Sequence, residues 1–201
     1  MGKKVIGIVG SYRENGTIDA AVSAALEGAQ KAGAQTEKIF LPNKKIAFCR
    51  NCRICTQDEN VWPRGSCPID DDMNDILSKI DAADGLILGS PVNFGTTTAI
   101  MKSFIERLVA YAFWPWGKAA PSNRIDKPTK KAVVISSSAA PSILTRLFMR
   151  NASTTMRMAA KVVGAKVTRT IYFGMVARTE DWRLDDKRIA QCRRAGSILV
   201  R

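Results

Sequence analysis

Short runs of apolar and β-branched residues alternate along this chain with longer segments that have helical spacing. The run VIGIVG at 5–10 is apolar on consecutive positions, which is typical of a parallel strand buried on both faces. Further short runs stand at 37–41, 85–92, 130–138 and 166–176. Strands that alternate with helices form a parallel sheet through right-handed crossovers, with helices on both faces. We therefore predict an α/β fold.

The segments between these strands predict the helices. Residues 17–32 are rich in alanine, with Thr17 as the expected cap. In DDDMNDILSKI at 70–80 the apolar residues recur at helical spacing, and the acidic first turn suits the helix dipole better than a bound cation. The remaining helices are predicted at 96–113, 142–164 and about 181–199.

This order of elements suits a flavodoxin-like three-layer sandwich whose five-stranded parallel sheet has the order 2-1-3-4-5. We expect residues 1–201 to form a single domain, with a cysteine-rich insertion at about 46–68. In such sheets ligands bind beyond the carboxyl ends of the strands, where strands 1 and 3 diverge. The loops that begin at Gly10, Ser90 and Ser136 are therefore the candidate site.

The first loop, GSYRENGT, lies between a strand and a helix N-terminus, where backbone N–H groups favour an anion. It is neither GxxxxGK[ST] nor GxGxxG, so nucleoside triphosphate and dinucleotide fingerprints are missing. The loop suits one phosphate monoester, and an ordinary capped turn is the alternative. The candidate ligands in this loop are Ser11, Arg13, Asn15, Gly16 and Thr17.

The second loop, SPVNFGTTT, presents an amide, an aromatic ring and glycine backbone beyond the third strand. Pro91 ends the strand, because the residue before a proline is held extended. Asn93, Phe94 and Gly95 would offer a flat heteroaromatic ligand both stacking and hydrogen bonds. The third loop, SSSAAP at 136–141, has small residues that let a ring approach closely.

Four of the five cysteines fall within nineteen positions, at Cys49, Cys52, Cys55 and Cys67. Three thiolates spaced as C-x₂-C-x₂-C, with a fourth further along, suit a [4Fe–4S] cluster. Zinc sites more often use two separated pairs, and free or redox-active thiols are the third alternative. Arg50, Arg53 and Arg64 would offset the negative charge of thiolate ligands. Cys192 is expected to be a lone packing or surface cysteine.

The chain has no histidine, so its chemistry must come from thiolates, carboxylates or a cofactor. The formal charge of +13 comes from residues 118–201, which hold 18 Lys/Arg against 5 Asp/Glu. Such a basic half would suit an anionic cofactor, an acidic redox protein or nucleic acid, or would simply be solvated. No nucleic-acid motif accompanies the charge, and no apolar run is long enough for a membrane span. We expect a cytoplasmic protein with reduced thiols.

Together, GSYRENGT, CPIDDDM, ADGLILGSPVNFG and IMKSFIERL resemble the NADPH-dependent FMN reductases of the flavodoxin superfamily over about residues 4–176. The added C-x₂-C-x₂-C resembles the iron-sulfur flavoprotein branch of that family. The resemblance implies FMN as cofactor, NAD(P)H as co-substrate, hydride transfer carried by the flavin itself, and a homodimer or tetramer. The implied phosphate ligands are Ser11, Arg13, Asn15, Thr17 and Ile18. The implied ring-contacting residues are Pro91, Val92, Asn93, Phe94 and Gly95, with Ser136, Ser137, Ser138 and Ala139 nearby.

The residues and the resemblance together predict an FMN-dependent NAD(P)H oxidoreductase that passes electrons to a small molecule such as a quinone, or through an iron-sulfur cluster. A non-enzymatic electron-transfer flavoprotein reduced by ferredoxin is the first alternative. A zinc-binding basic module that contacts nucleic acid is the second. The Trp114-Pro115-Trp116 loop is expected either to cover the flavin, to lie at a dimer interface, or to pack on its own chain.

Overall fold

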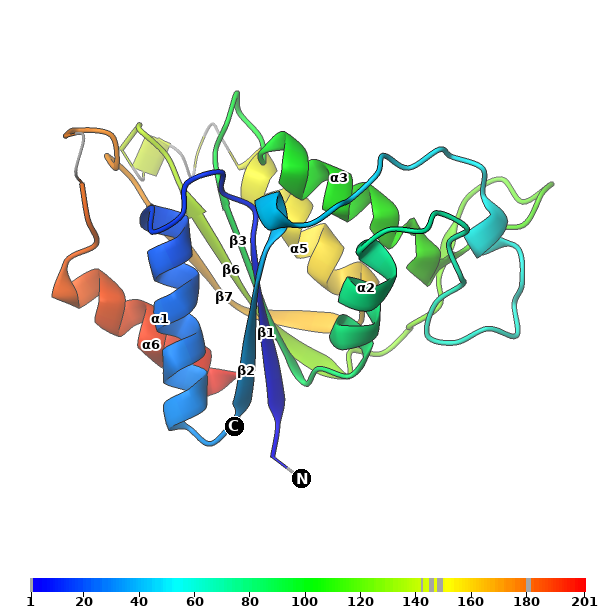
Figure 1. Cartoon of the computed structure of the whole chain (residues 1–201), viewed down its shortest axis with the longest axis horizontal. Coiled ribbons are helices and arrows are strands. Elements are labelled where there is room, and N and C mark those ends of the chain that lie inside the picture. Colours follow the sequence, from blue (N-terminus) through cyan, green and yellow to red (C-terminus); the bar gives the residue numbers. More distant parts are fainter. Residues whose placement is uncertain (1, 142, 145–146, 148–149, 180–181) are drawn as a thin grey trace.

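The computed structural model describes residues 2–141, 143–144, 147, 150–179 and 182–201. At its centre five parallel strands form one sheet with the order β2-β1-β3-β6-β7 (Figure 1). The strands are β1 (Lys4–Val9), β2 (Gln35–Phe40), β3 (Gly85–Pro91), β6 (Lys130–Ser137) and β7 (Ala165–Phe173). Counted along the chain, this is the predicted order 2-1-3-4-5, which is therefore confirmed.

Helices cover both faces of the sheet (Figure 1). The helices α1 (Thr17–Lys31) and α6 (Asp186–Ile198) pack together on one face. The helices α2 (Met73–Asp81), α3 (Ala99–Arg107) and α5 (Asn151–Val162) lie on the other face. This arrangement is the flavodoxin-like three-layer sandwich that the sequence predicts.

The apolar runs build two cores because successive side chains of a strand point to opposite faces of the sheet. In β1, Val5 and Val9 belong to the core beneath α1 and α6, whereas Ile6 and Ile8 belong to the core beneath α2, α3 and α5. All four side chains are at most 5% exposed, which explains why the run is apolar at every position. The sheet is thus buried on both faces, and the site must lie at its ends or edges.

Several helix boundaries differ from the prediction, two of them near the predicted loops. Gly16, not Thr17, is the N-cap of α1, and no side chain accepts a hydrogen bond there. The helix predicted at 96–113 is shorter, because Thr98 caps its start and the chain tightens into a 3₁₀ turn after Arg107. The chain then becomes extended at Ala112.

The proline-rich segment 113–128 holds a feature that the sequence did not predict. Residues Ala112–Phe113 (β4) and Ser122–Asn123 (β5) form a small antiparallel pair. Of the predicted helices 142–164 and 181–199, residues 142, 145–146, 148–149 and 181 lie outside the described residues. Among the residues that are described, no helix is both long and apolar enough to cross a membrane.

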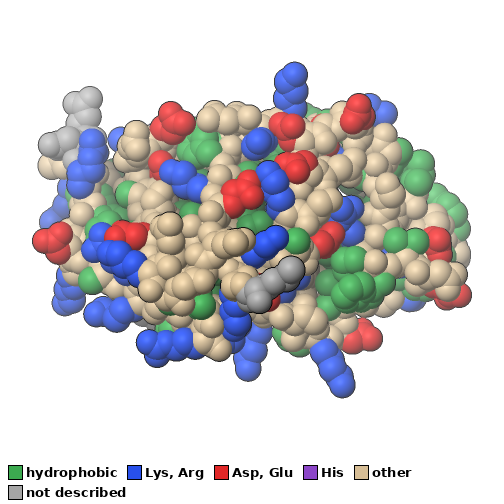
Figure 2. Space-filling view, turned by 60° about the horizontal axis from the view of Figure 1, so that its bottom comes forward, with side chains coloured by type: hydrophobic (Ala, Val, Ile, Leu, Met, Phe, Trp, Pro, Cys, Tyr) green, Lys and Arg blue, Asp and Glu red, His purple; other side chains and the backbone are tan. Residues whose placement is uncertain are grey.

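Lys and Arg side chains are spread over the face shown in Figure 2, with Asp and Glu side chains among them. Elsewhere in the described chain, cations pair with carboxylates, as with Lys38 and Asp19 or Arg193 and Glu27. The visible part of the surface is therefore a mixed one.

Candidate functional site

The first two predicted loops are joined by hydrogen bonds at the carboxyl end of the sheet. The backbone N–H of Gly10 donates to Gly89 O at 2.8 Å, which extends the pairing of β1 with β3. Thr98 Oγ1 donates to Gly10 O at 2.5 Å, and Thr98 N donates to Ser90 Oγ at 3.2 Å. The N-cap of α3 is therefore fastened to the ends of both β1 and β3.

The third loop joins the same edge through its backbone. Val92 N donates to Ser137 O at 2.7 Å, and Ser138 N donates to Phe173 O at 2.9 Å. Ser136 is fully buried, and its Oγ donates to Ser90 O at 3.1 Å. Ser136 thus helps to hold β3 and β6 together.

A cleft of about 280 Å³ opens where the three loops meet. The predicted residues that line it are Ser11, Arg13, Thr17, Ile18, Pro91, Val92, Asn93, Ser137 and Ser138, with Ala139. The predicted residues Asn15, Gly16, Phe94, Gly95 and Ser136 are not among its lining residues. Tyr12, Val176 and Ala177 line the cleft as well. Val176 and Ala177 follow β7, so inspection of the loop after the fifth strand would have found them.

The N-terminus of α1 meets this cleft without a side-chain cap. The first N–H groups of a helix have no acceptor within the helix, so a ligand or water must satisfy them. The glycine N-cap leaves them open, and Thr17 and Ile18 at that end line the cleft. Asn15 has a φ of 56°, and its N–H is already bound to Asp19 Oδ2 at 2.9 Å. The geometry suits an anion bound by α1 and the Arg13 side chain.

Phe94 and Gly95 form the tip of a tight turn beyond β3. Asn93 and Thr96 pair through two backbone hydrogen bonds of 2.8 and 3.1 Å, and this closes the turn. Both residues at the tip have positive φ, 50° at Phe94 and 81° at Gly95. A positive φ is unfavourable for phenylalanine, whose ring is also 109% exposed. The unfavourable backbone and the fully exposed aromatic ring together set this residue apart from the rest of the loop.

The four clustered cysteines line a second cavity, of about 220 Å³. All five cysteines of the chain are free thiols. Gly65 lies so close to Cys55 that a Cβ at Gly65 would meet Cys55 O at 1.9 Å. Because Cys67 follows two residues later, this close contact places Cys67 near the C-x₂-C-x₂-C loop. In the described residues, no three thiols or carboxylates are already gathered tightly enough to share one metal ion.

Burial, and after it the neighbouring thiols Cys67, Cys49 and Cys52, together raise the pKa of the Cys55 thiol to about 11. As thiolates, these three neighbours would repel a Cys55 thiolate. A cation or a metal-sulfur core is the partner that would relieve this repulsion. Cys192 is also buried, in the core beneath α1 and α6, and burial raises its pKa to about 12. It is a packing residue.

Arg53 lies in the middle of the cysteine loop, in left-handed conformation with a φ of 59°. Its guanidinium stacks on Trp114 at 3.8 Å and on Trp116 at 4.3 Å from the ring centres. It also donates to Trp114 O at 2.6 Å and Pro115 O at 3.0 Å. The tryptophan loop therefore packs on its own chain through Arg53, while Trp116 remains 69% exposed.

The Nε–H of Arg53 is buried and has no acceptor among the described residues, although Arg53 lines the cysteine cavity. A buried N–H without a partner costs free energy, so a sulfur or another anion in the cavity would be favoured. Of the other predicted cations, Arg50 lines the cavity, whereas Arg64 does not and pairs with Asp81 at 2.8 Å. The donor set of thiols and buried N–H groups fits a thiolate-ligated cluster.

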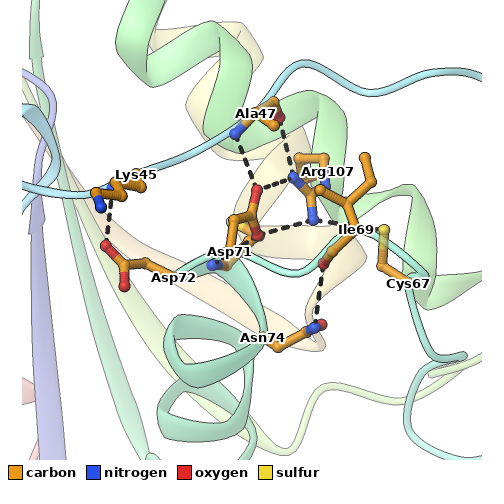
Figure 3. A network of polar contacts seen from close by, with 9 residues as sticks. Lys45, Ala47, Cys67, Ile69, Asp71, Asp72, Asn74 and Arg107 are labelled. Carbon is orange, nitrogen blue, oxygen red and sulfur yellow. Dashed lines mark hydrogen bonds and ion pairs between the residues drawn. The ribbon is translucent and has the colours of Figure 1, made fainter.

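Arg107 is the cation near the thiols that the sequence did not reveal. Its Nη2 lies 3.4 Å from Cys67 Sγ, and its Nη1 lies 2.6 Å from Asp71 Oδ2 (Figure 3). Burial by itself raises the pKa of the Asp71 carboxyl, but hydrogen bonds from Arg107 and from the N–H groups of Ala47 and Met73 outweigh it and hold that pKa below its ordinary value. The second aspartate of the acidic run therefore binds Arg107 and the backbone, a role that the helix dipole alone did not predict.

The geometry thus defines a flavodoxin-like protein. It has one cleft at the carboxyl edge of its sheet and a second cavity lined by cysteines. Residues 3–174 match the family described as NADPH-dependent FMN reductase. The chain belongs to this family, as its loop motifs indicate.

Curated relatives of the chain include two iron-sulfur flavoproteins. One, from Methanocaldococcus jannaschii, is 42% identical over 104 residues, which are 52% of this chain and 51% of that protein. The other, from Methanosarcina thermophila, is 38% identical over 106 residues, 53% of this chain and 52% of that protein. The chain thus spans about half the length of the curated relatives it matches.

Solved structures of similar fold include the NAD(P)H:quinone oxidoreductase from Methanothermobacter marburgensis. It has a TM-score of 0.68 and 21% identity, over 98% of both chains. An FMN-dependent NADH-azoreductase from Bacillus anthracis, solved with FMN, has a TM-score of 0.68 and 12% identity over the full length of both chains. At these identities the structures support the flavodoxin-like fold alone.

Proposed function

We propose that this chain is an FMN-dependent NAD(P)H oxidoreductase. The observation that carries the proposal is the cleft formed by the three loops, with the uncapped N-terminus of α1 at one end and small or apolar residues at the other. Bound there, FMN would accept a hydride and release its two electrons singly or together. The protein needs no general base for this chemistry, in keeping with a chain that has no histidine.

In this proposal the residues divide into two groups. Ser11, Arg13, Thr17 and Ile18 bind the phosphate, with Asn15 and Gly16 shaping the turn around it. Pro91, Val92, Asn93, Phe94 and Gly95 contact the flavin ring, and Ser137 and Ser138 line its other side. Ser136 does not contact the flavin in this proposal; its hydrogen bond to Ser90 O stabilises the strands that carry these residues.

We propose further that Cys49, Cys52, Cys55 and Cys67 bind an iron-sulfur cluster. The shared cavity, the buried N–H of Arg53 and the contact of Arg107 with Cys67 support this set of ligands. Loading requires the four thiols to draw together from the positions they have here. The final acceptor in this proposal is a small molecule or an acidic redox protein, and the assembly is a homodimer or tetramer in the cytoplasm.

The second candidate function is that of an electron-transfer flavoprotein reduced by ferredoxin. The iron-sulfur flavoproteins among the relatives of this chain favour that function. Family membership in the FMN reductases weighs against the zinc-binding module that contacts nucleic acid. Stopped-flow mixing of the FMN-loaded protein with NADPH or NADH separates the first two. Rapid bleaching of the flavin bands supports the reductase, and no bleaching with either nucleotide refutes it.

A further inference from the structure

The buried ion pair Arg107–Asp71 closes the cysteine-bearing segment at both of its ends (Figure 3). Arg107 donates to Ala47 O at 2.9 Å, and Asp71 Oδ2 accepts from Ala47 N at 2.9 Å. The same guanidinium reaches Cys67 Sγ at 3.4 Å. Residue 47 precedes the first cysteine and Cys67 is the last of the four, so one pair of side chains fixes both ends of the segment.

The Arg107 side chain is 1% exposed and that of Asp71 is 6% exposed, so water does not compete for either group. The two terminal guanidinium nitrogens, Nη1 and Nη2, contact the carboxylate and the sulfur in different ways. Nη1 contacts Asp71 Oδ2, while Nη2 contacts both Asp71 Oδ1 at 3.1 Å and Cys67 Sγ. The planar guanidinium carries its donors on separate nitrogens at fixed angles, whereas lysine carries three donors on a single nitrogen and cannot reproduce this geometry.

The helix that ends at Arg107 begins at the flavin cleft. Its N-cap, Thr98, is hydrogen-bonded to Gly10 O and Ser90 Oγ, and nine residues later Arg107 contacts Cys67. A helix of nine residues is about 13 Å long. This helix therefore connects the end of the sheet near the proposed flavin cleft with the cysteine cavity.

We propose that Arg107 is a positioning residue that sets the reduction potential of the cysteine site through its hydrogen bond to Cys67 Sγ. Hydrogen bonds to ligand sulfur atoms withdraw electron density and stabilise the more negative, reduced state of a cluster. The inference rests on the proposed cluster, and it adds a residue outside the cysteine motif. The cluster would take up one electron from an added reductant such as dithionite, and the sulfur would keep its bond to iron.

The test is the Arg107→Lys variant, reconstituted with iron and sulfide and loaded with FMN. Lysine keeps the positive charge beside Asp71 but lacks the second nitrogen, Nη2, that contacts Cys67 Sγ in the wild type. We expect the equilibrium constant for one-electron reduction of the cluster to fall about tenfold, which is about 59 mV for one electron. The potential is measured anaerobically from the absorbance near 400 nm, with the flavin potential as an internal reference that stays unchanged.

Arg64→Lys is the matched control, because it is the same exchange at a cation that contacts Asp81 and Ser78 instead of a thiol. Its cluster potential is expected to equal that of the wild type. If Arg107→Lys binds no iron, the double variant Arg107→Gln, Asp71→Asn replaces the ion pair without leaving a charge unpaired.

An unchanged cluster potential in either iron-loaded variant overturns the role of Arg107. Loss of iron from both variants, with FMN affinity retained, supports it as the residue that places Cys67. If the reconstituted wild type shows flavin bands but binds no iron, the proposed cluster is refuted together with this inference. The flavin site would be unaffected by that result.

Discussion

The Phe94→Gly substitution, at the tip of the turn beyond β3, should affect the stability of the protein and its affinity for FMN in opposite ways. The Phe94 ring is 109% exposed, so its removal gives up no burial within the chain. At a φ of 50° a left-handed backbone costs a residue with a Cβ about 1–2 kcal/mol, whereas glycine adopts it freely. Glycine costs about 0.5–1 kcal/mol through the entropy of the unfolded chain. We therefore expect the free energy of unfolding of the flavin-free protein to stay constant or rise by about 1 kcal/mol.

The same change is expected to weaken FMN binding. Burying a phenylalanine side chain against a ligand stabilises the complex by about 1.5–3 kcal/mol, and each 1.4 kcal/mol is tenfold in affinity. The dissociation constant of FMN should therefore rise about 10- to 100-fold, as measured by the change in flavin fluorescence on binding. Urea unfolding of the flavin-free protein gives the stability.

Phe48→Gly is the control, because Phe48 is 77% exposed but lies outside the three loops and does not have positive φ. It should lower stability slightly and leave FMN affinity unchanged. The reasoning would be refuted by a Phe94→Gly protein that is less stable by more than about 1 kcal/mol yet binds FMN as the wild type does. That result would mean that the ring packs on its own chain instead of serving a ligand.

Three further predictions concern the polar contacts around the cysteine cavity. Tyr111→Phe removes the hydrogen bond from a buried hydroxyl to Asp81 at 2.6 Å, and urea unfolding should show a loss of about 1.5–3 kcal/mol. Arg53→Ala removes the stacking between two tryptophans, so stability should fall by about 1–2 kcal/mol and tryptophan fluorescence should change; an unchanged spectrum would contradict the stacking. The lowered pKa of Asp71 means that its pairing with Arg107 stabilises the fold above the ordinary carboxyl pKa and is lost as the pH falls through the folded value. Asp71→Asn should therefore flatten the loss of melting temperature below about pH 4, and an unaltered acid profile would argue against it.

The fold followed from local patterns. The consecutive apolar residues of β1, β3 and β6 indicated strands buried on both faces, and their alternation with helices left one parallel topology. The errors lie at the ends of helices, where packing against other segments determines the boundary. Nothing local indicated that the helix after Thr98 ends at Arg107, since the tightening of the chain and the extended Ala112 beyond depend on packing against other segments.

Of the two candidate sites, the cleft was the more predictable. Its loops follow strands whose carboxyl ends must meet in a parallel sheet, so residues as distant as Ser11, Asn93 and Ser137 were expected together. The structure also showed which of them face the cleft. Ser136, in the same run of serines, does not line the cleft and instead donates to Ser90 O, because successive side chains of β6 point to opposite faces.

The sequence by itself determined the chemistry available: four clustered thiols, three loops at one edge of the sheet and no histidine. These depend on residue type and spacing, which local physics translates into strands, turns and candidate ligands. Only the tertiary structure brought Arg107 to Cys67 across 40 positions and Arg53 to Trp114 across 61. A long side chain reaches its partner through the packing of several elements at once, and no short stretch of sequence carries that information.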